Sequence, residues 1–460
     1  MERGDSVEQH NRRLTDVRFL IDENAPKVLL PHQFYYPQIS TINDRYSNDK
    51  KDAFSNQLSE LCDEKKEIMV YVHIPFCDSH CKFCSFDKAY SLEEVSGYIN
   101  RIVDEAKYYS RFEYFKSATI TSIHFGGGTP TLLLPEQLDK IINCIYKYFS
   151  VNKDCVINIE GSASTLSQEA IIDFIKHSNI SRVSVGVQTF DETTRKFYDS
   201  FSTLKQVWQA LNALKNNNIV TYIDIMYGYP LYDIDYSDYK RVIRDINIAI
   251  SLKIDGIEFG QLYPYYNNME QLIKNGNLKF ESKQQLFELM KDASDIMLDN
   301  GYKQQTEYGF IHSRGKIILE NAYYGNEGKL LECLALGSSA FGNLAGWKYR
   351  NMFYKSYMNK KTDAYLQIKK LNEYENKMCG IVGFPKLLEI SKRALERIMD
   401  YKDTLITFQW LQKKGMIEDQ GLYYKLTSRG KCYIDNIYMS LLSEEERKKL
   451  VNTVKIHIME

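Results

Sequence analysis

The chain has 460 residues, of which 44% are hydrophobic and 26% charged, and its formal net charge is −1. This balance is ordinary for a globular protein and argues against bulk attraction to nucleic acid or to an anionic membrane. Residues 1–6 contain no apolar segment of the kind that begins a secretion signal, and no stretch approaches the roughly 18 apolar residues of a membrane span. We therefore expect a cytoplasmic protein with one large domain and additions, or two to three smaller domains.

Residues 1–66 are polar and irregular and predict a lead-in segment. From Ile68 onward, short β-branched apolar runs alternate with stretches of helical periodicity. The predicted strands are Ile68–Ile74, Ile120–Phe125, Cys155–Glu160, Arg182–Val187, Thr221–Met226 and Gly256–Leu262. The predicted helices cover residues 92–109, 135–149, 167–177, 203–217, 235–252 and 282–299. Ser91 and Glu94 form a capping-box pattern, and Pro135 suits the first turn of its helix.

This alternation predicts an α/β fold over residues 67–374, with parallel strands joined by right-handed crossovers. Six or more such units favour a partial or full (β/α) barrel, whose active site lies at the C-terminal ends of the strands. Over residues 375–460 the pattern changes to helices at Ser391–Met399 and Thr404–Lys414, a β-hairpin over 415–430 and a last helix from about Lys431. It predicts a winged-helix-like module, which lacks the basic concentration typical of DNA binding.

Three of the nine cysteines, Cys77, Cys81 and Cys84, follow the first predicted strand with the spacing C-x3-C-x2-C. An odd cysteine count in a long cytosolic chain argues against a disulfide framework. Three thiolates can hold a four-iron cluster while one iron stays open, and an open position is typical of a catalytic metal centre. A zinc site completed by His73 or His80 is a weaker alternative, because no second Cys/His pair lies at zinc-ribbon spacing.

Polar and glycine-rich motifs end the later strands. The second strand runs into His124-Phe-Gly-Gly-Gly-Thr-Pro130, where glycines let the backbone approach a ligand and expose its polar groups. The third strand ends at Glu160, the fourth leads to Gln188 and the fifth carries Asp224. Each of these residues alone is as consistent with a helix cap or a satisfied loop as with a ligand. As an ordered set at one end of a barrel, they predict a binding site.

Together these motifs resemble the radical S-adenosylmethionine (SAM) enzymes, and their order resembles the oxygen-independent coproporphyrinogen III oxidase-like (HemN-like) branch. The resemblance runs from about Tyr71 to Tyr263, and continues through residues 334–340 and the C-terminal module. It implies that Cys77, Cys81 and Cys84 hold a [4Fe-4S] cluster whose open iron binds SAM. An electron from the cluster then cleaves SAM to a 5′-deoxyadenosyl radical. The resemblance places at SAM the residues Tyr71, Phe83, Gly126, Gly127, Gly128, Thr129, Glu160, Gln188 and Asp224.

The chain departs from the HemN-like pattern at two positions. Phe86 stands where coproporphyrinogen oxidases have a fourth cysteine, which weakens the decarboxylase interpretation. Ser200 stands where the family has an arginine near the SAM carboxylate, and Arg195 is a candidate to replace it. The segment 332–342 resembles radical SAM methyltransferases of the haem-utilisation type, in which a second SAM supplies a methyl group. That resemblance implies that Gly337–Ala340 lines the SAM region, whereas a buried strand with a small-residue turn is the alternative.

The sequence therefore favours a radical SAM enzyme that C-methylates a tetrapyrrole or another conjugated ring, with one or two SAM molecules bound. Its expected partners are a small-molecule substrate and an electron donor such as flavodoxin or ferredoxin, without nucleic acid or membrane. Oxidative decarboxylation of coproporphyrinogen III and haem binding as a chaperone stay open, and a DNA-binding regulator is least favoured. Tyr227, Tyr263 and Tyr265 are candidates for the pocket wall, with core packing as the alternative.

Overall fold

The computed structural model describes most of the chain, and the account below is confined to the described residues. These are 14–22, 24–31, 36–37, 45–60, 65–78, 81–89, 91–230, 238–265, 269–275, 278–312, 331–359 and 365–459.

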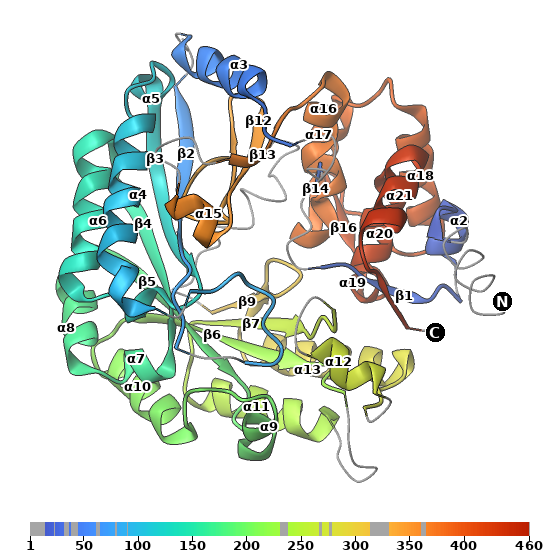
Figure 1. Cartoon of the computed structure of the whole chain (residues 1–460). Coiled ribbons are helices and arrows are strands. Elements are labelled where there is room, and N and C mark those ends of the chain that lie inside the picture. The colour runs from blue at the N-terminus through green and yellow to red at the C-terminus, as the bar shows by residue number, and fades with distance from the viewer. Residues whose placement is uncertain are drawn as a thin grey trace.

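A strongly curved sheet of 12 strands forms the larger part of the molecule (Figure 1). Its order is β13-β12-β11-β10-β2-β3-β4-β5-β6-β7-β9-β8. The six predicted strands are confirmed as mutually parallel neighbours, β2 (Lys66–Ile74), β3 (Ala118–Gly127), β4 (Ser150–Ser162), β5 (Ile180–Gln188), β6 (Val220–Tyr227) and β7 (Gly256–Gln261). Within the described residues β13 and β8 end the sheet without pairing to each other, so the barrel is partial.

The sheet extends beyond the parallel strands on both sides. On one side β10 (Glu332–Leu336) pairs in parallel with β2, and an antiparallel series follows, β11 (Phe341–Leu344), β12 (Trp347–Asn351) and β13 (Tyr365–Lys370). On the other side β9 (Gly309–Ile311) and β8 (Lys303–Gln304) run antiparallel beside β7. We call β10–β13 the lateral extension.

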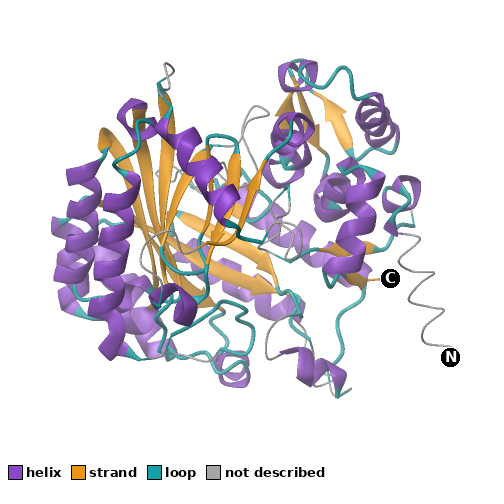
Figure 2. Ribbon diagram, turned by 45° about the horizontal axis from the view of Figure 1, so that its top comes forward, coloured by secondary structure: helices purple, strands orange, loops and turns teal. Residues whose placement is uncertain are grey.

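Helices cover the convex face of the sheet, and its concave face is turned inward (Figure 2). The long helices lie where they were predicted, at α4 (Val95–Tyr109), α6 (Pro135–Tyr148), α8 (Glu169–His177), α10 (Leu204–Asn216), α11 (Asp238–Ser251) and α13 (Lys283–Asp299). Shorter ones are α5 (Tyr114–Ser117), α7 (Ala163–Leu166), α9 (Glu192–Phe197), α12 (Met269–Lys274) and α15 (Tyr354–Met358). Pro135 occupies the first turn of α6, as predicted. The predicted capping box is wrong, because a 3-10 turn over Leu92–Glu94 precedes α4 and the Ser91 side chain makes no cap hydrogen bond.

A second, smaller hydrophobic core belongs to the C-terminal part of the chain. Its three-stranded sheet, β14 (Glu389–Ser391), β16 (Tyr423–Leu426) and β15 (Ile417–Asp419), contains the predicted hairpin. Around it lie α16 (Glu373–Val382), α17 (Lys392–Glu396), α18 (Lys402–Lys413), α19 (Ser428–Cys432), α20 (Ile434–Leu441) and α21 (Glu444–Thr453). The predicted last helix is thus three shorter ones, and α17 is shorter than expected. The arrangement of helices and hairpin is that of a winged-helix-like module.

The N-terminal segment is more ordered than its sequence predicts. It contains α2 (Val17–Leu20), β1 (Lys27–Leu29) and α3 (Asn48–Ser59), and β1 pairs antiparallel with the C-terminal strand β17 (His457–Met459). The Asn436 side chain accepts from the Val28 N–H over 2.9 Å and donates to the Leu20 carbonyl over 3.0 Å. Leu20 of α2 and Val28 of β1 are buried against the distant C-terminal module, and Phe54 of α3 against Trp347 and Tyr349 of the lateral extension, which local sequence periodicity cannot reveal. The domain boundaries themselves stay a prediction.

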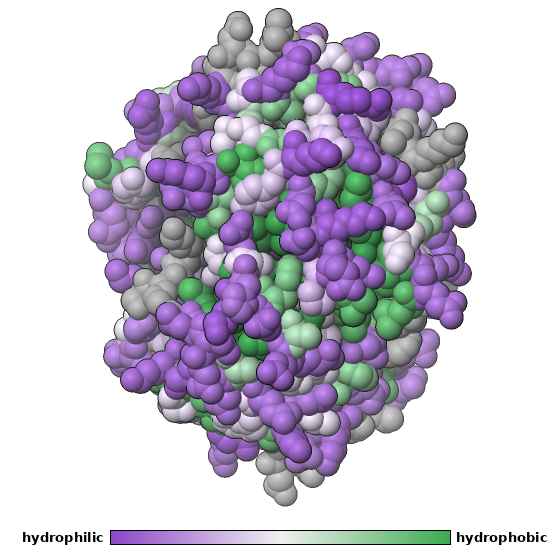
Figure 3. Space-filling model, turned by 90° about the vertical axis from the view of Figure 1, so that its left-hand side faces the viewer, coloured by the Kyte–Doolittle hydropathy of each residue, from purple (hydrophilic) through white to green (hydrophobic). Residues whose placement is uncertain are grey.

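One face of the outer surface is mainly polar. Figure 3, which faces the side on the left of Figure 1, shows mainly hydrophilic side chains with scattered apolar ones, as is usual for a protein surface. Among the described helices, none combines the length and the apolar character that crossing a bilayer requires.

Candidate functional site

The cysteine loop follows β2 and is fastened to the end of β3. The Cys77 N–H donates to the Ala89 carbonyl over 3.2 Å, and the Gly128 N–H donates to the Ile74 carbonyl over 2.7 Å. The Cys77 sulfur lies 3.4 Å from the Thr129 hydroxyl. A Cβ on Gly128 would come within 2.5 Å of a carbonyl oxygen of this loop, so only glycine fits there. The glycine N–H groups were expected to be exposed to a ligand, but that of Gly128 is bonded to the end of β2 instead.

The three thiols of this loop share one electrostatic environment. Burial alone would lower the pKa of the Lys88 ammonium, but the charges of Cys84, Cys77 and Cys81 together raise it. Burial also raises the pKa of the Cys84 thiol, and Lys88 partly offsets that rise. The described residues contain no group of three or more Cys, His, Asp or Glu side chains already set around a metal position. His80, named for the zinc alternative, lies outside the described residues.

Glu160, at the end of β4, is oriented by a chain of buried polar groups. The Arg182 Nε donates to Asn158 Oδ1 over 2.7 Å, which directs the Asn158 amide N–H₂ toward His124 Nδ1 at 2.9 Å. His124 Nδ1 is then the acceptor, so Nε2 carries the hydrogen and donates to Glu160 Oε1 over 2.7 Å. The His124 ring stacks on Tyr71, with centroids 5.7 Å apart. His124 and Asn158 were not among the predicted site residues, although they follow the strand alternation that placed Glu160.

The glycines at the end of β3 make room for this carboxylate. A Cβ on Gly126 would lie 3.0 Å from Glu160 Oε1 and 3.1 Å from the Tyr71 hydroxyl. Gly127 has a positive φ of 112°, and its Cβ would meet the His73 ring at 2.7 Å. The Tyr71 hydroxyl lies 3.2 Å from His73 Nδ1, and burial lowers the pKa of His73 to about 4. His73 is therefore a neutral, packed ring at neutral pH.

Gln188 and Asp224 continue the same edge on β5 and β6. Gln188 ends β5 with a positive φ of 66°, uncommon for a residue other than glycine and often found at ligand sites. Its Nε2 lies 3.5 Å from Asp224 Oδ2. Burial, and next the Glu160 charge, raise the pKa of Asp224 to about 7, against the opposing effects of Gln188 and Arg182. The predicted residues on β3, β4, β5 and β6 therefore meet at one edge, where two carboxylates offer acceptors for ammonium and hydroxyl groups.

A comparison with protein families matches residues 71–252 to the model described as the radical SAM superfamily. Residues 71–252 therefore form a radical SAM domain. Its cofactors are accordingly a [4Fe-4S] cluster and SAM. The residues present fit both groups. Three thiols in one loop are the donors that iron–sulfur clusters take, and the two carboxylates across the strand ends suit a cationic, hydroxyl-bearing ligand. The role of each residue stays a prediction.

Several HemN-like proteins resemble this radical SAM chain over much of its length. Anaerobilin synthase of Escherichia coli O157:H7 is 26% identical over 402 residues, which cover 85% of this chain and 86% of the relative. The heme chaperone HemW of Lactococcus lactis is 26% identical over 399 residues, or 84% of this chain and 91% of the relative. The oxygen-independent coproporphyrinogen III oxidase of Escherichia coli K12 is 27% identical over 243 residues, or 52% and 51%.

A solved structure supports the fold. Coproporphyrinogen III oxidase (HemN) from Escherichia coli superposes with a TM-score of 0.73 at 18% identity, and the match covers 90% of this chain and 99% of that one. The predicted radical SAM type of α/β barrel is therefore confirmed.

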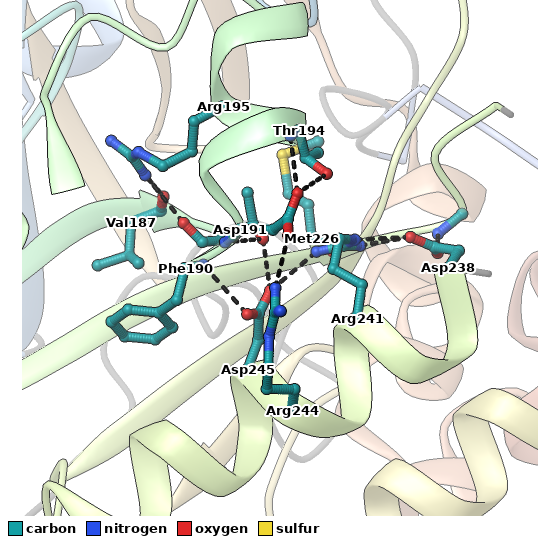
Figure 4. Close-up of polar contacts among 12 residues, drawn as sticks. Val187, Phe190, Asp191, Thr194, Arg195, Met226, Asp238, Arg241, Arg244 and Asp245 are labelled. Atoms are coloured by element: carbon teal, nitrogen blue, oxygen red, sulfur yellow. Dashed lines mark hydrogen bonds and ion pairs between the residues drawn. The ribbon is translucent and has the colours of Figure 1, made fainter. Parts of the chain in front are cut away.

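Arg195 does not take the place of the family arginine that Ser200 lacks. Its Nη1 donates to the Val187 carbonyl over 2.6 Å (Figure 4) and to the Thr189 carbonyl over 2.9 Å, and Nη2 donates to the Ser202 carbonyl. Both terminal nitrogens thus hold the turn that follows β5. The expectation that Arg195 reaches the SAM carboxylate is therefore wrong.

Helix α11 holds the same turn from below. Asp245 accepts from the Thr189 hydroxyl over 2.5 Å and from the Phe190 N–H over 3.1 Å, and Arg241 Nη1 bonds it at 2.9 Å (Figure 4). Arg241 also contacts Asp238 Oδ1 at 2.6 Å. The Asp238, Arg241 and Asp245 side chains are almost fully buried, and they lie at i, i+3 and i+7 of one helix face. That spacing was the available signal for a buried ionic network behind Gln188.

The segment Gly337–Ala340 supports the end of β2. The Gly337 N–H donates to Glu105 Oε2 over 2.9 Å, and a Cβ on Gly337 would lie 2.6 Å from the His73 carbonyl. The Tyr98 hydroxyl donates to that carbonyl over 2.7 Å and receives the Ser338 N–H over 2.8 Å. The alternative of a buried strand and a small-residue turn therefore accounts for these contacts.

The aromatic candidates differ in exposure. Phe83 lies beside Tyr198 with ring centroids 6.4 Å apart, and Phe86 is 44% exposed. Tyr227 is buried and stacks on a phenylalanine of β7, and the Tyr263 hydroxyl donates to the Lys455 carbonyl. Packing therefore accounts for Tyr227 and Tyr263.

Proposed function

We propose that this radical SAM enzyme of the HemN family C-methylates a tetrapyrrole during haem degradation, or methylates a related conjugated ring. The observation that carries the proposal is the match to anaerobilin synthase, which spans 85% of this chain and 86% of that protein. The match to the coproporphyrinogen oxidase of Escherichia coli K12 spans about half of either chain. Phe86, in place of a fourth cysteine, also favours methylation over decarboxylation.

In this proposal the residues at the strand ends have two separate roles, cluster binding and SAM binding. Cys77, Cys81 and Cys84 hold the cluster, and Glu160 and Asp224 bind polar groups of SAM. When bound, the cluster and SAM supply the electron, the 5′-deoxyadenosyl radical and the methyl group. The chain orients the Glu160 carboxylate through His124 and excludes water with the buried face of β2–β6.

The remaining SAM contacts are proposed by resemblance: Tyr71, Phe83, Gly126, Gly127, Gly128, Thr129 and Gln188. The proposal also includes a second SAM molecule as methyl donor, an electron donor such as flavodoxin or ferredoxin, and a cytoplasmic location. It assigns no role in nucleic-acid or membrane binding.

A haem chaperone is the second candidate, because HemW of Lactococcus lactis covers 84% of this chain at 26% identity. A chaperone binds haem stoichiometrically, whereas an enzyme turns SAM over many times. The two proposals therefore differ in the number of SAM molecules that each protein molecule consumes.

The test is anaerobic reconstitution with iron and sulfide, followed by mass spectrometry of SAM products with haem, coproporphyrinogen III or no substrate. We expect S-adenosylhomocysteine together with 5′-deoxyadenosine when haem is present. Deoxyadenosine with CO₂ from coproporphyrinogen would replace the proposal by decarboxylation. Haem binding without repeated SAM turnover would replace it by the chaperone.

A further inference from the structure

The lateral extension presents a row of three side chains on one face. Arg350 on β12 lies opposite Phe341 on β11 and opposite Gln367 on β13. Partners directly opposite each other in antiparallel strands project to the same face, so the three side chains are neighbours. The next residue along β12, Tyr349, projects to the other face, where it stacks on Tyr109 of α4. The row therefore lies on the face of the lateral extension that is turned away from α4.

This face adjoins the cysteine loop. Arg350 and Asp87 interact electrostatically, and both also act on His73 at the end of β2. Asp87 belongs to the cysteine loop and accepts from the Ser339 hydroxyl over 3.1 Å and from the Tyr354 N–H over 3.0 Å. The row thus flanks the loop on the side opposite β3–β6, where the SAM residues meet.

Two hydrogen-bond donors in this row are buried and lack a partner. Gln367 is 3% exposed, and among the residues that the structure describes neither its Nε2 nor the Arg350 Nε has a hydrogen-bond partner. Buried donors are nearly always paired, because leaving them without water or a partner is costly. Two such donors on opposed residues of adjacent strands point to a shared acceptor that another molecule brings.

The surroundings of Arg350 favour a flat, acidic molecule. The guanidinium carbon lies 4.6 Å from the Phe341 ring centroid and 4.8 Å from that of Phe353. Phe353 is 44% exposed and offers a free aromatic surface. On β12 and β13 the same face carries Lys348 and Lys369, and Lys369 is balanced by Glu375 at 2.5 Å. A guanidinium fixed between rings presents its fork of donors in one orientation, which suits a carboxylate.

We propose that Arg350 and Gln367 form a subsite that binds a carboxylate side chain of the substrate, with Phe353 against its conjugated ring. The inference rests on the proposed function and names the substrate class, a planar macrocycle bearing carboxylate arms. Arg350 supplies the charge and Gln367 a second donor. The alternative source of a carboxylate near the cysteine loop is SAM itself, and the experiment separates the two.

The experiment measures binding of haem and of haem dimethyl ester to the reconstituted protein by absorption titration, and of SAM by equilibrium dialysis. We expect Arg350→Met to weaken haem binding about tenfold to a hundredfold and Gln367→Leu about threefold to tenfold. Neither variant should change the affinity for the diester or for SAM. Arg393→Met, at an exposed position of α17, is the matched control and should leave all three affinities unchanged.

Equal affinity of wild type and Arg350→Met for haem would overturn the subsite, and so would an equal loss for haem and diester. A loss of SAM affinity would assign Arg350 to the cofactor and also overturn it. If Arg350→Met does not fold, the wild type decides, because binding haem no better than the diester contradicts the inference. Haem binding that depends on Arg350 but yields no SAM products would support the subsite and reject the proposed function. SAM turnover with haem binding that does not depend on Arg350 would support the proposed function and reject the subsite.

Discussion

The two flanks of the cysteine loop differ in how Glu160, on one side, and Arg350 and Gln367, on the other, are held. On the β3–β6 side, Glu160 is held through His124, Asn158 and Arg182 in one connected chain of hydrogen bonds. On the lateral extension, Arg350 and Gln367 keep buried donors without a partner. A side whose groups hold one another is preorganised for one ligand, and a side with unmatched donors depends on its ligand to complete it. The first flank therefore suits the cofactor and the second suits the substrate.

The largest effect is expected where both flanks meet, at the cluster. Cys81→Ala should abolish the visible iron–sulfur absorption after reconstitution and all SAM cleavage, because two thiolates cannot replace three. Cys155→Ala, in β4 and outside the loop, should retain both. Full cluster absorption in Cys81→Ala would mean that the loop is not the ligand set.

The next effect concerns the support of the cofactor flank. Arg241→Met leaves Asp238 and Asp245 buried without their cation, which should cost about 3–5 kcal/mol in the free energy of unfolding. Arg244→Met removes only the half-exposed ion pair with Asp191 and should cost under about 1 kcal/mol. Urea denaturation of the apo protein measures both, and similar losses for the two variants would contradict a buried network.

A smaller effect is expected from the orientation of Glu160. His124→Leu removes the donor to the carboxylate, and SAM affinity should fall about tenfold. Haem affinity should stay unchanged, because His124 belongs to the cofactor flank. His177→Leu, on the exposed surface of α8, serves as the control. Equilibrium dialysis of the reconstituted protein measures the change, and a parallel loss of haem affinity would erase the distinction between the flanks.

The last effect is a pH dependence at Asp224. Its pKa in the folded protein is about 7, above the ordinary 3.8, so ionisation destabilises the folded state increasingly as pH rises through that interval. Asp224→Asn removes this penalty. The melting temperature of the variant should therefore gain on the wild type between about pH 4 and pH 8, while Asp299→Asn, at an exposed position, should not. A constant difference across this range would rule out the raised pKa.

The cofactor flank was the more predictable one. Its strands are short runs rich in β-branched residues, and Glu160, Gln188 and Asp224 lie in or at the ends of three of them, so the strand pattern alone predicts that these residues share one edge of the sheet. What the sequence could not show were partnerships set by register between strands. His124 meets Glu160 only because β3 and β4 pair in one register.

The lateral extension shows more clearly which contacts cannot be predicted from the sequence. Arg350 and Gln367 are 17 positions apart and become neighbours only through the pairing of β12 with β13. Arg195 failed as a cofactor ligand for a similar reason, because the compact turn before Ser202 brings three carbonyls within its reach. Spacing along the chain shows which residue types are near one another, whereas packing determines which groups are already satisfied.

The central claim is the transfer of a methyl group to a tetrapyrrole, and labelled SAM tests it most directly. The reconstituted protein is supplied with an electron donor, haem and SAM carrying a deuterated methyl group, and the tetrapyrrole product is weighed by mass spectrometry. We predict a product that carries the label, formed with S-adenosylhomocysteine over many turnovers. An unlabelled tetrapyrrole, with or without 5′-deoxyadenosine, would contradict the account.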